Sequence, residues 1–404
     1  MRVLQINTVC GIGSTGRIAT DIDTLLKKQG HESFVAYGRD IPKSCDTAIK
    51  IGSDFGNYSH VAKTRLLDQH GFGSVYATKK FINRIEELNP DVIHLHNIHG
   101  YYLNVNLLFK YLKKVNKPVV WTLHDCWPFT GHCSYFDYVN CSKWQTGCYS
   151  CPQKKSYPTS VILDNSKDNY SKKKEIFTGV ENLTIVTPSK WLAELVKQSF
   201  LSEYPVKVIN NGIDLESFKP TQSHFRDNNN LQSKFIILGV AGVWEKRKGY
   251  DHFLELSKML RPDEVIIMVG LTDKQRKRLP SNIIGISRTN SIQELAEIYS
   301  TSDVFINPTL EDNFPTTNIE ALACGTPIIT YKTGGSVECL DNDCGFVVNK
   351  GSIKELLMKI DIVKNKGKSS YKNYCIERAA KLYDKKDRFN EYIQLYKLSG
   401  NNIF

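Results

Sequence analysis

The chain repeats one pattern twice, because short β-rich runs alternate with amphipathic helical stretches both before and after a polar segment. Such alternation is typical of parallel sheets covered by helices. The polar segment, residues 215–234, is rich in Asn, Ser and Gln and lacks periodicity, which indicates a linker. The sequence therefore predicts an α/β protein with two doubly wound, Rossmann-like domains. The predicted strands are 3–7, 33–37, 92–96, 119–123, 184–187 and 206–209, then 235–240, 264–269, 283–286, 304–307, 327–331 and 345–347; predicted helices include 16–28, 78–88, 105–114 and 374–398.

The predicted domain boundaries follow from the linker. We expect an N-terminal domain over residues 1–220, with a cysteine-rich insertion at about 126–152, and a C-terminal domain over 221–385. The last helical stretch could pack on either domain. Tandem parallel sheets are expected to turn their strand ends toward a common cleft, where a nucleotide-like ligand would bind.

Charge and hydropathy narrow the class of partner. The formal net charge of +11 favours anionic partners such as nucleotide phosphates, nucleic acid or an acidic membrane surface. No arginine-rich tract with interleaved aromatics is present, so we do not expect nucleic-acid binding. No apolar run approaches the roughly 20 residues that span a bilayer, and the start lacks the features of a signal peptide. These observations predict a cytoplasmic protein.

A glycine-rich loop, Gly11-Ile-Gly-Ser-Thr-Gly16, follows the first predicted strand and precedes a helix. It matches the dinucleotide fingerprint, in which glycines let the backbone approach a diphosphate at a helix N-terminus. The acidic residue expected at the end of the second strand is absent, and Arg39 there could meet a 2′-phosphate. Three interpretations stay open: a loop facing the inter-domain cleft, which we favour, an NADP site, and a structural turn.

Two motifs in the second half place charged groups at the ends of predicted strands. Asp312-Asn-Phe-Pro-Thr-Thr-Asn-Ile-Glu320 sets two carboxylates eight positions apart around a strand-to-helix turn. Carboxylates accept hydrogen bonds from vicinal hydroxyls, and the N–H groups of such a turn favour phosphate. The alternative, helix capping, explains only one carboxylate.

The second motif, Glu245-Lys-Arg-Lys-Gly249, follows strand 235–240. Cations at this position would neutralise a leaving diphosphate; the alternative is a solvated surface.

Five of the eleven cysteines fall between Cys126 and Cys151. An odd total without a secretory signal argues against a disulfide framework. Four thiolates could hold a structural zinc tetrahedrally, although only one pair has C-x2-C spacing. Buried reduced thiols and disulfides are the alternatives. The candidate zinc ligands are Cys133, Cys141, Cys148 and Cys151.

These motifs together resemble family 4 of the retaining glycosyltransferases, which have the GT-B fold. The resemblance rests on residues 312–330, on Arg247-Lys248-Gly249, and on the segments Pro188-Ser-Lys-Trp, Asn211-Gly-Ile-Asp214 and Phe218-Lys-Pro220, in the expected order along nearly the whole chain. The segment 120–152 is similar to bacterial exopolysaccharide and O-antigen transferases of the colanic-acid biosynthesis type.

The resemblance implies roles for particular residues. The family's E-x7-E pair, which grips the donor sugar and the nucleotide ribose, matches Asp312 and Glu320, with Glu311 as an alternative sugar contact. The donor-phosphate lysine matches Lys248, and Arg247 substitutes for a family arginine that has no clear match. The cleft histidine matches His124. The remaining expected contacts are Asn313, Phe314, Pro315, Thr316 and Thr317, with Gly13 and Gly16 near the diphosphate and acceptor.

The resemblance also implies an activity. We expect a retaining glycosyltransferase that moves a sugar from a nucleotide-diphosphate sugar to a saccharide or polyprenyl-diphosphate-linked acceptor in bacterial surface polysaccharide synthesis. No catalytic cofactor or divalent metal is expected. From the net charge we also expect peripheral contact with an anionic membrane, with a solvated basic surface as the alternative. A C-terminal helix over 386–404 is expected to cross back to the N-terminal domain. The alternatives are an NADP-dependent oxidoreductase using residues 11–16 and a GT-B sugar-nucleotide epimerase.

Overall fold

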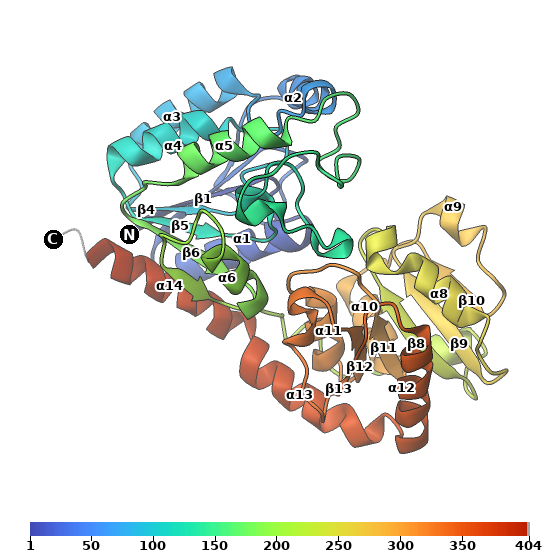
Figure 1. Cartoon of the computed structure of the whole chain (residues 1–404). Helices are drawn as coiled ribbons and strands as arrows, with labels where there is room; N and C mark the ends of the chain where they lie inside the picture. Colours follow the sequence, from blue (N-terminus) through green and yellow to red (C-terminus); the bar gives the residue numbers. More distant parts are fainter. Residues whose placement is uncertain (402–404) are drawn as a thin grey trace. The chain divides into compact units, whose positions relative to one another are not determined.

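The computed structural model describes residues 1–401, which fold into two compact units (Figure 1). Unit 1 contains residues 1–210 and the C-terminal residues from Arg388 onward; unit 2 contains residues 211–387. The sequence placed these boundaries at 220 and 385. Within the described residues, no helix is both long enough and apolar enough to cross a membrane.

Unit 1 is built on a seven-stranded parallel sheet in the order β3-β2-β1-β4-β5-β6-β7. The order reverses between β1 and β4, so the loops after these two strands diverge and leave room for a ligand at their C-terminal ends. The elements are β1 Arg2–Asn7, β2 Glu32–Tyr37, β3 Ala48–Lys50, β4 Val92–Leu95, β5 Val119–Thr122, β6 Leu183–Thr187 and β7 Val206–Val208, with α1 Gly13–Lys28, α2 Asp54–Leu67, α3 Val75–Leu88, α4 Val105–Val115, α5 Ser166–Phe177, α6 Lys190–Lys197 and the single-turn helices η1 Trp127–Phe129, η2 Asp137–Val139 and η3 Lys143–Gln145.

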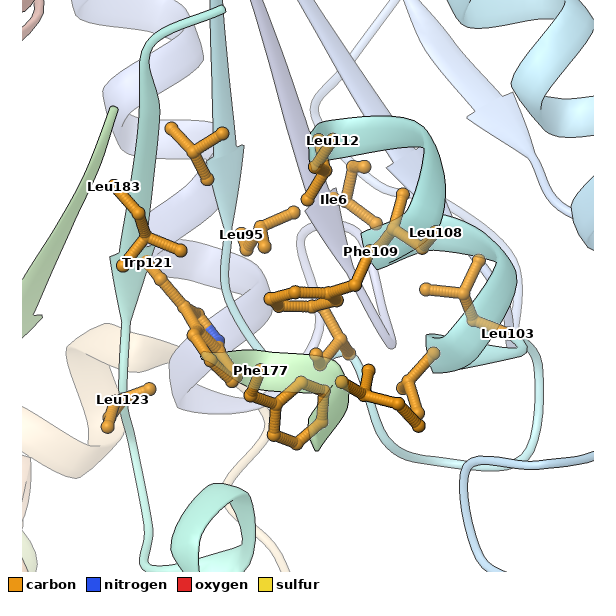
Figure 2. Packing of buried hydrophobic residues seen from close by; sticks show 14 of the residues in the cluster. Ile6, Leu95, Leu103, Leu108, Phe109, Leu112, Trp121, Leu123, Phe177 and Leu183 are labelled. Carbon is orange, nitrogen blue, oxygen red and sulfur yellow. The ribbon is translucent and has the colours of Figure 1, made fainter. Parts of the chain in front are cut away.

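Both faces of this sheet are buried, as expected for strands with near-continuous apolar runs. One face packs under α3, α4 and α5, where Phe109, Trp121 and Phe177 contact one another at ring distances of 4.6–5.3 Å (Figure 2). The other face packs against α1 and the last helix, α14 Lys385–Asn401. Tyr396 of α14 donates its hydroxyl proton to His94 Nδ1 of β4 at 2.6 Å, so this helix belongs to the core of unit 1 from Arg388 onward.

Unit 2 contains a six-stranded parallel sheet in the order β10-β9-β8-β11-β12-β13. The strand order reverses between β8 and β11, which is the expected ligand position in this unit. The elements are β8 Phe235–Val240, β9 Glu264–Val269, β10 Ile283–Ile286, β11 Val304–Asn307, β12 Ile328–Tyr331 and β13 Gly345–Val348, with α7 Phe225–Asn228, α8 Tyr250–Ser257, α9 Asp273–Arg276, α10 Ile292–Thr301, α11 Thr316–Ala323, α12 Ile353–Lys366, α13 Ser369–Tyr383, η4 Lys246–Lys248 and η5 Gly334–Val337.

The predicted single helix over 374–398 is wrong, because the structure divides it at Asp384 into α13 and α14. Asp384 has an extended backbone, with φ −57° and ψ 123°. The segment after residue 210 runs against this break: Ile213 N–H donates to the Tyr383 carbonyl at 2.7 Å, and Lys385 N–H donates to the Ile213 carbonyl at 3.0 Å. Only a glycine fits at 212, since a Cβ there would lie 2.5 Å from the Lys385 Cα. A pairing partner distant in sequence therefore ends α13.

The insertion of unit 1 has an aromatic core of its own. Phe129, Phe136 and Trp144 pack with ring centroids 4.9–6.4 Å apart. Beneath them Lys173 of α5 is fully buried; its Nζ donates to the carbonyls of Trp127 and Thr130 at 2.8 and 3.1 Å and lies 3.5 Å from the Trp127 ring centroid. Burial lowers the pKa of Lys173 to about 7. The single-turn helices are thus fixed by side-chain packing and one buried amine.

Candidate active site

In unit 2 the predicted donor residues gather at the C-terminal ends of the two central strands. The loop after β8 leads into η4, which carries Arg247 and Lys248, and the loop after β11 carries Asp312. Lys248 Nζ donates to Asp312 Oδ2, and both side chains are largely buried. This ion pair joins the two motifs across the point where the strand order reverses, which is where open α/β sheets bind ligands.

Two glycines allow this close packing. Gly249, at φ 79°, ends η4, and a Cβ there would lie 2.3 Å from the Pro308 carbonyl oxygen. Gly334, at φ 50°, begins η5, and a Cβ there would lie 1.9 Å from the Asp312 carbonyl oxygen. Both positions combine a left-handed backbone with a backbone contact, so a side chain at either would displace the loop that carries Asp312.

Helix α11 begins directly after this loop. Pro315 occupies its N-cap position, and Thr316 and Thr317 are only partly buried in its first turn. First-turn N–H groups lack partners within the helix, so this end of α11 favours an anionic or oxygen-rich ligand. Asn313 and Phe314 are buried, and the Phe314 carbonyl accepts from Asn211 Nδ2 at 3.1 Å. The predicted donor contacts 313–317 are therefore contiguous with the ion pair.

Glu320 lies one turn further along α11 and is 4% exposed. Tyr299 of α10 donates its hydroxyl proton to Glu320 Oε2 at 2.9 Å, which fixes the carboxylate. The orientation of α11 depends on buried Asn318, which accepts from Asn307 Nδ2 at 2.8 Å and donates to Ser336 at 3.0 Å. The anchor of Glu320, Tyr299, and the residue that orients α11, Asn318, were not among the predicted site residues.

Arg247 and Glu311 directly precede Lys248 and Asp312 in the sequence. Arg247 Nε donates to Glu245 Oε2 at 3.1 Å, and its carbonyl accepts from Leu310 N–H at 2.7 Å, so the arginine backbone supports the loop after β11. Glu311 is buried beside Asp312. Asp312 forms the ion pair with Lys248.

In unit 1 the glycine-rich loop joins β1 to α1. Gly13 starts α1 at φ 64°, with nothing within 4 Å of a Cβ position, so its surroundings are open. Gly16 faces Val9, and its carbonyl accepts from Gly11 N–H at 3.0 Å, which closes the turn. A Cβ on Gly11 would lie 2.0 Å from the Lys43 carbonyl oxygen. The loop is therefore compact at Gly11 and Gly16 and accessible at Gly13.

His124 follows β5 and is held by a chain of hydrogen bonds. Its Nε2 lies 3.2 Å from His96 Nδ1, His96 Nε2 lies 3.1 Å from Gln5 Oε1, and Gln5 Nε2 donates to the Ala19 carbonyl at 2.9 Å. Because Gln5 Oε1 can only accept, the chain places a proton on Nε2 of each histidine and makes His124 Nδ1 an acceptor. Burial lowers the pKa of His124 to about 4, so the ring is neutral near pH 7 and suited to accept from a sugar hydroxyl.

A second polar pair at this edge was not predicted from the sequence. His99 Nε2 lies 3.1 Å from Asp125 Oδ2, and the His99 ring stacks on Trp127 at 4.9 Å. Burial opposes ionisation of Asp125, but His99 and the Trp127 N–H outweigh it, and the Asp125 pKa is lowered. The sequence contained a signal for this pair, because His96 and His99 follow the end of β4 and Asp125 directly follows His124.

The four candidate zinc ligands line one cavity of about 10 Å³, roughly the space that one water needs. Cys133 and Cys151 are hydrogen-bonded, which raises the pKa of Cys133 and lowers that of Cys151 to about 7. Gly131 N–H donates to Cys148 Sγ at 3.1 Å. Across residues 1–401, however, no three His, Cys, Asp or Glu side chains are arranged to hold a metal ion. Zinc would therefore require Cys133, Cys141, Cys148 and Cys151 to move toward the cavity.

The fold and site define a class of protein with two Rossmann-like units and a carboxylate–lysine site on the second. Residues 15–217, half of the chain, match the profile of Glycosyltransferase Family 4, and residues 221–382 match Glycosyl transferases group 1. The chain therefore belongs to glycosyltransferase family 4, with the GT-B fold. This membership decides against the oxidoreductase and epimerase alternatives.

Particular relatives extend this comparison. WcaC of Escherichia coli K12, provisionally assigned as a colanic acid biosynthesis glycosyl transferase, is 26% identical over 98% of this chain and 99% of its own. N,N'-diacetylbacillosaminyl-diphospho-undecaprenol alpha-1,3-N-acetylgalactosaminyltransferase of Campylobacter jejuni is 26% identical over 48% of this chain and 58% of its own.

Solved structures share the fold along almost the full length. Sucrose-phosphate synthase of Thermosynechococcus elongatus has a TM-score of 0.73 at 16% identity, with 98% of each chain covered. HepE of Anabaena in complex with UDP has a TM-score of 0.70 at 15% identity, covering 98% of this chain and 100% of its own. At these identities the likeness concerns the fold alone.

Proposed function

We propose that this glycosyltransferase takes its sugar from a nucleoside-diphosphate sugar bound at the β8/β11 edge of unit 2. The observation that carries the proposal is the Lys248–Asp312 ion pair beside the N-terminus of α11. Lys248 and Arg247 would face the diphosphate, Glu320 the ribose, and Asp312 with residues 313–317 the sugar. HepE, a protein of this fold, is described in complex with UDP-glucose, which supports a donor of this chemistry.

The ion pair suggests how donor binding would proceed. Without donor, Asp312 neutralises Lys248. An incoming diphosphate competes for the ammonium group through charge-assisted hydrogen bonds, which frees the Asp312 carboxylate to accept from sugar hydroxyls. One exchange of partners would thus prepare both the leaving group and the sugar contact.

We further propose that transfer retains the anomeric configuration and needs no divalent metal. The bond between the anomeric carbon and the β-phosphate oxygen breaks, the acceptor oxygen bonds to that carbon on the same face, and the acceptor proton passes to the leaving phosphate. Lys248, Arg247 and the α11 dipole would stabilise the developing phosphate charge. This sequence requires no protein nucleophile.

For the acceptor, we propose a saccharide or a polyprenyl-diphosphate-linked saccharide in surface polysaccharide synthesis. The printed roles of two relatives, one in colanic acid biosynthesis and one named for a diphospho-undecaprenol-linked acceptor, support this class. In unit 1, neutral His124 would accept a hydrogen bond from a substrate hydroxyl. The open backbone at Gly13 would leave room for the substrate.

Thermal unfolding with UDP, GDP, ADP and NADP tests the donor assignment. A ligand at about a hundred times its dissociation constant stabilises by roughly 2.7 kcal/mol. We expect one nucleoside diphosphate to stabilise the wild type and the control Lys246→Gln, and to lose most of this effect in Lys248→Gln and Glu320→Gln. Stabilisation by NADP alone, or equal nucleotide binding in all variants, contradicts the site.

A turnover assay tests retention and metal independence. Turnover that survives excess EDTA and yields the donor's anomeric configuration by NMR supports both. Loss of turnover in EDTA contradicts metal independence, and inversion contradicts retention.

For the insertion, we propose that the four cysteines bind one structural zinc. The support is their convergence on a single cavity, with Cys151 held close to the thiolate form. Elemental analysis of protein purified without chelator should find one zinc per chain, lost in Cys148→Ser. Absence of zinc together with eleven titratable thiols would show that the cysteines are simply reduced.

A further inference from the structure

Two cysteines of unit 1, Cys10 and Cys45, lie side by side although they are distant in the sequence. Cys10 belongs to the glycine-rich loop after β1 and is 1% exposed. Cys45 lies between β2 and β3, is partly exposed, and packs against the small cluster of buried side chains that contains Cys10. Both thiols are free, and they share a hydrogen bond. The fold therefore brings two reduced sulfurs together, one of them on a residue that solvent reaches.

The backbone holds the two cysteine segments against each other. Lys43 N–H, two residues before Cys45, donates to the Cys10 carbonyl at 3.1 Å. On the other side of Cys10, a Cβ at Gly11 would lie 2.0 Å from the Lys43 carbonyl oxygen, so a glycine is needed for the segments to approach this closely. Main-chain contacts thus support the pairing of the two thiols.

The hydrogen bond between the two thiols makes them differ in acidity. The Cys10 thiol donates to Cys45, which lowers the pKa of Cys45 to about 7 although burial opposes its ionisation. The same hydrogen bond, together with burial, raises the pKa of Cys10. Cys45 Sγ also lies 3.8 Å from Thr47 Oγ1 and 3.7 Å from Asp23 Oδ2, and Lys27 Nζ pairs with that carboxylate at 2.9 Å. Near pH 7, Cys45 therefore supplies a thiolate nucleophile while Cys10 keeps its proton.

We propose that Cys45 is an oxidation site whose product is a disulfide with Cys10. The oxidant is hydrogen peroxide. The Cys45 thiolate attacks one peroxide oxygen, the O–O bond breaks, and the hydroxide that leaves takes up a proton, so that Cys45 becomes a sulfenic acid and water is released. The Cys10 sulfur then attacks the Cys45 sulfur, the S–O bond breaks, and the Cys10 proton leaves with the oxygen as a second water. Two thiols thus lose two electrons to one peroxide.

Burial distinguishes this pair from a second cysteine pair in unit 2. Cys344 and Cys375 are also hydrogen-bonded, and Cys375 Sγ lies 3.8 Å from the Cys344 carbonyl oxygen. Both residues are at most 1% exposed, so an oxidant in solvent does not reach them in the folded chain. Redox-sensitive cysteines combine an accessible thiolate with a neighbouring second thiol. Of the two pairs, Cys10–Cys45 meets both conditions.

The disulfide would act on the glycine-rich loop. It would join Cys10 covalently to the segment between β2 and β3, directly before Gly11 and Gly13. The surroundings of Gly13 are open, and they are the place proposed above for substrate. Oxidation should therefore restrict this loop and slow sugar transfer. This consequence rests on the proposed function, whereas formation of the disulfide does not.

Peptide mapping of the full chain tests the oxidation site. The folded protein is treated with hydrogen peroxide, its remaining thiols are blocked with iodoacetamide in denaturant, and it is digested with trypsin. We expect peptide 3–17 to be linked to peptide 44–50 through Cys10 and Cys45, with a mass two hydrogens below the sum of the two peptides. Dithiothreitol should release both peptides. The control pair, Cys344 and Cys375, should be recovered with iodoacetamide on both sulfurs.

Two variants separate the two steps of the oxidation. In Cys45→Ser the linked peptide should be absent. In Cys10→Ser the serine hydroxyl can still donate to Cys45 but forms no disulfide, so dimedone should label the sulfenic acid of Cys45. Wild-type turnover should be largely lost after peroxide and restored by dithiothreitol, whereas Cys45→Ser should keep its turnover. Circular dichroism shows whether both variants are folded.

The outcomes that contradict the proposal are distinct. Wild-type chain in which Cys10 and Cys45 both carry iodoacetamide after peroxide, or in which Cys45 is linked to a different cysteine, overturns the oxidation site. A complete Cys10–Cys45 disulfide that leaves turnover at the reduced rate overturns the effect on the loop. Absence of transfer by the reduced chain contradicts the proposed function, and the peptide map then decides the oxidation site independently.

Discussion

Acidification should destabilise unit 1 through its buried neutral histidines, and His60 shows why. The side chain is 2% exposed, and its Nε2 accepts from Gly71 N–H at 3.2 Å and from Gly73 N–H at 3.1 Å. Its Nδ1 lies 3.0 Å from Ser74 Oγ. A proton added at Nε2 would face two N–H donors and break both hydrogen bonds, and the ring is too deeply buried for bulk solvent to stabilise the charge.

The size of this loss of folding stability follows from the pKa of His60. Burial, with a smaller contribution from Lys63, lowers the pKa of His60 to about 4, whereas an unfolded histidine titrates near 6.5. The unfolded chain binds the extra proton first, so this stability is complete above about pH 6.5 and is lost as the pH falls toward 4. At pH 5 the loss is about 2 kcal/mol.

Three further histidines act in the same direction. Burial also holds the pKa values of His70, His94 and His96 well below the usual range. Each of these histidines therefore adds to the loss of stability on acidification, and by pH 5 unit 1 should lose more than the contribution of His60 alone.

Urea unfolding at pH 7.5 and pH 5, followed by circular dichroism and tryptophan fluorescence, measures this loss. In His60→Gln the difference between the two pH values should shrink by about 2 kcal/mol, although the variant is less stable at pH 7.5. The control His224→Gln, at a side chain that is 90% exposed, should keep the wild-type difference. An identical pH dependence in His60→Gln and wild type would refute the argument.

Three other substitutions test particular contacts. Gly334→Ala should reduce nucleotide binding at least tenfold, because its Cβ would lie 1.9 Å from a backbone oxygen of the carboxylate loop; Gly351→Ala, also at positive φ but with nothing within 4 Å, should bind normally by calorimetry. Lys173→Met should lower the unfolding free energy by about 2–4 kcal/mol in urea titrations, since two buried carbonyls lose their donor; an unchanged midpoint would contradict this. Tyr396→Phe should cost about 1–2 kcal/mol and speed hydrogen exchange in α14, because His94 loses a buried partner; wild-type exchange would show that packing alone holds the helix.

Local sequence pattern was sufficient for the sheets. Predicted strands 235–240, 264–269, 283–286 and 304–307 coincide with β8, β9, β10 and β11. Parallel strands buried on both faces require continuous apolar runs, and these runs are visible without any tertiary information. The edge strand β3 was missed because it is three residues long and only partly buried. The motif around Asp312 was also local, since the end of β11 at Asn307 and the start of α11 at Thr316 are only nine positions apart.

What the sequence could not provide were pairings between distant residues. Tyr299 anchors Glu320 from another helix, His96 orients His124 from another strand, and Ile213 breaks a helix at Asp384. Helix α2 was also hard to predict, because polar residues such as Asn57 occupy its inner side and its apolar periodicity is weak. The sequence by itself determined the strands, the order of motifs and the family, because these depend on neighbours along the chain. The tertiary structure decided protonation states and side-chain anchors, because those depend on which residues the fold brings into contact.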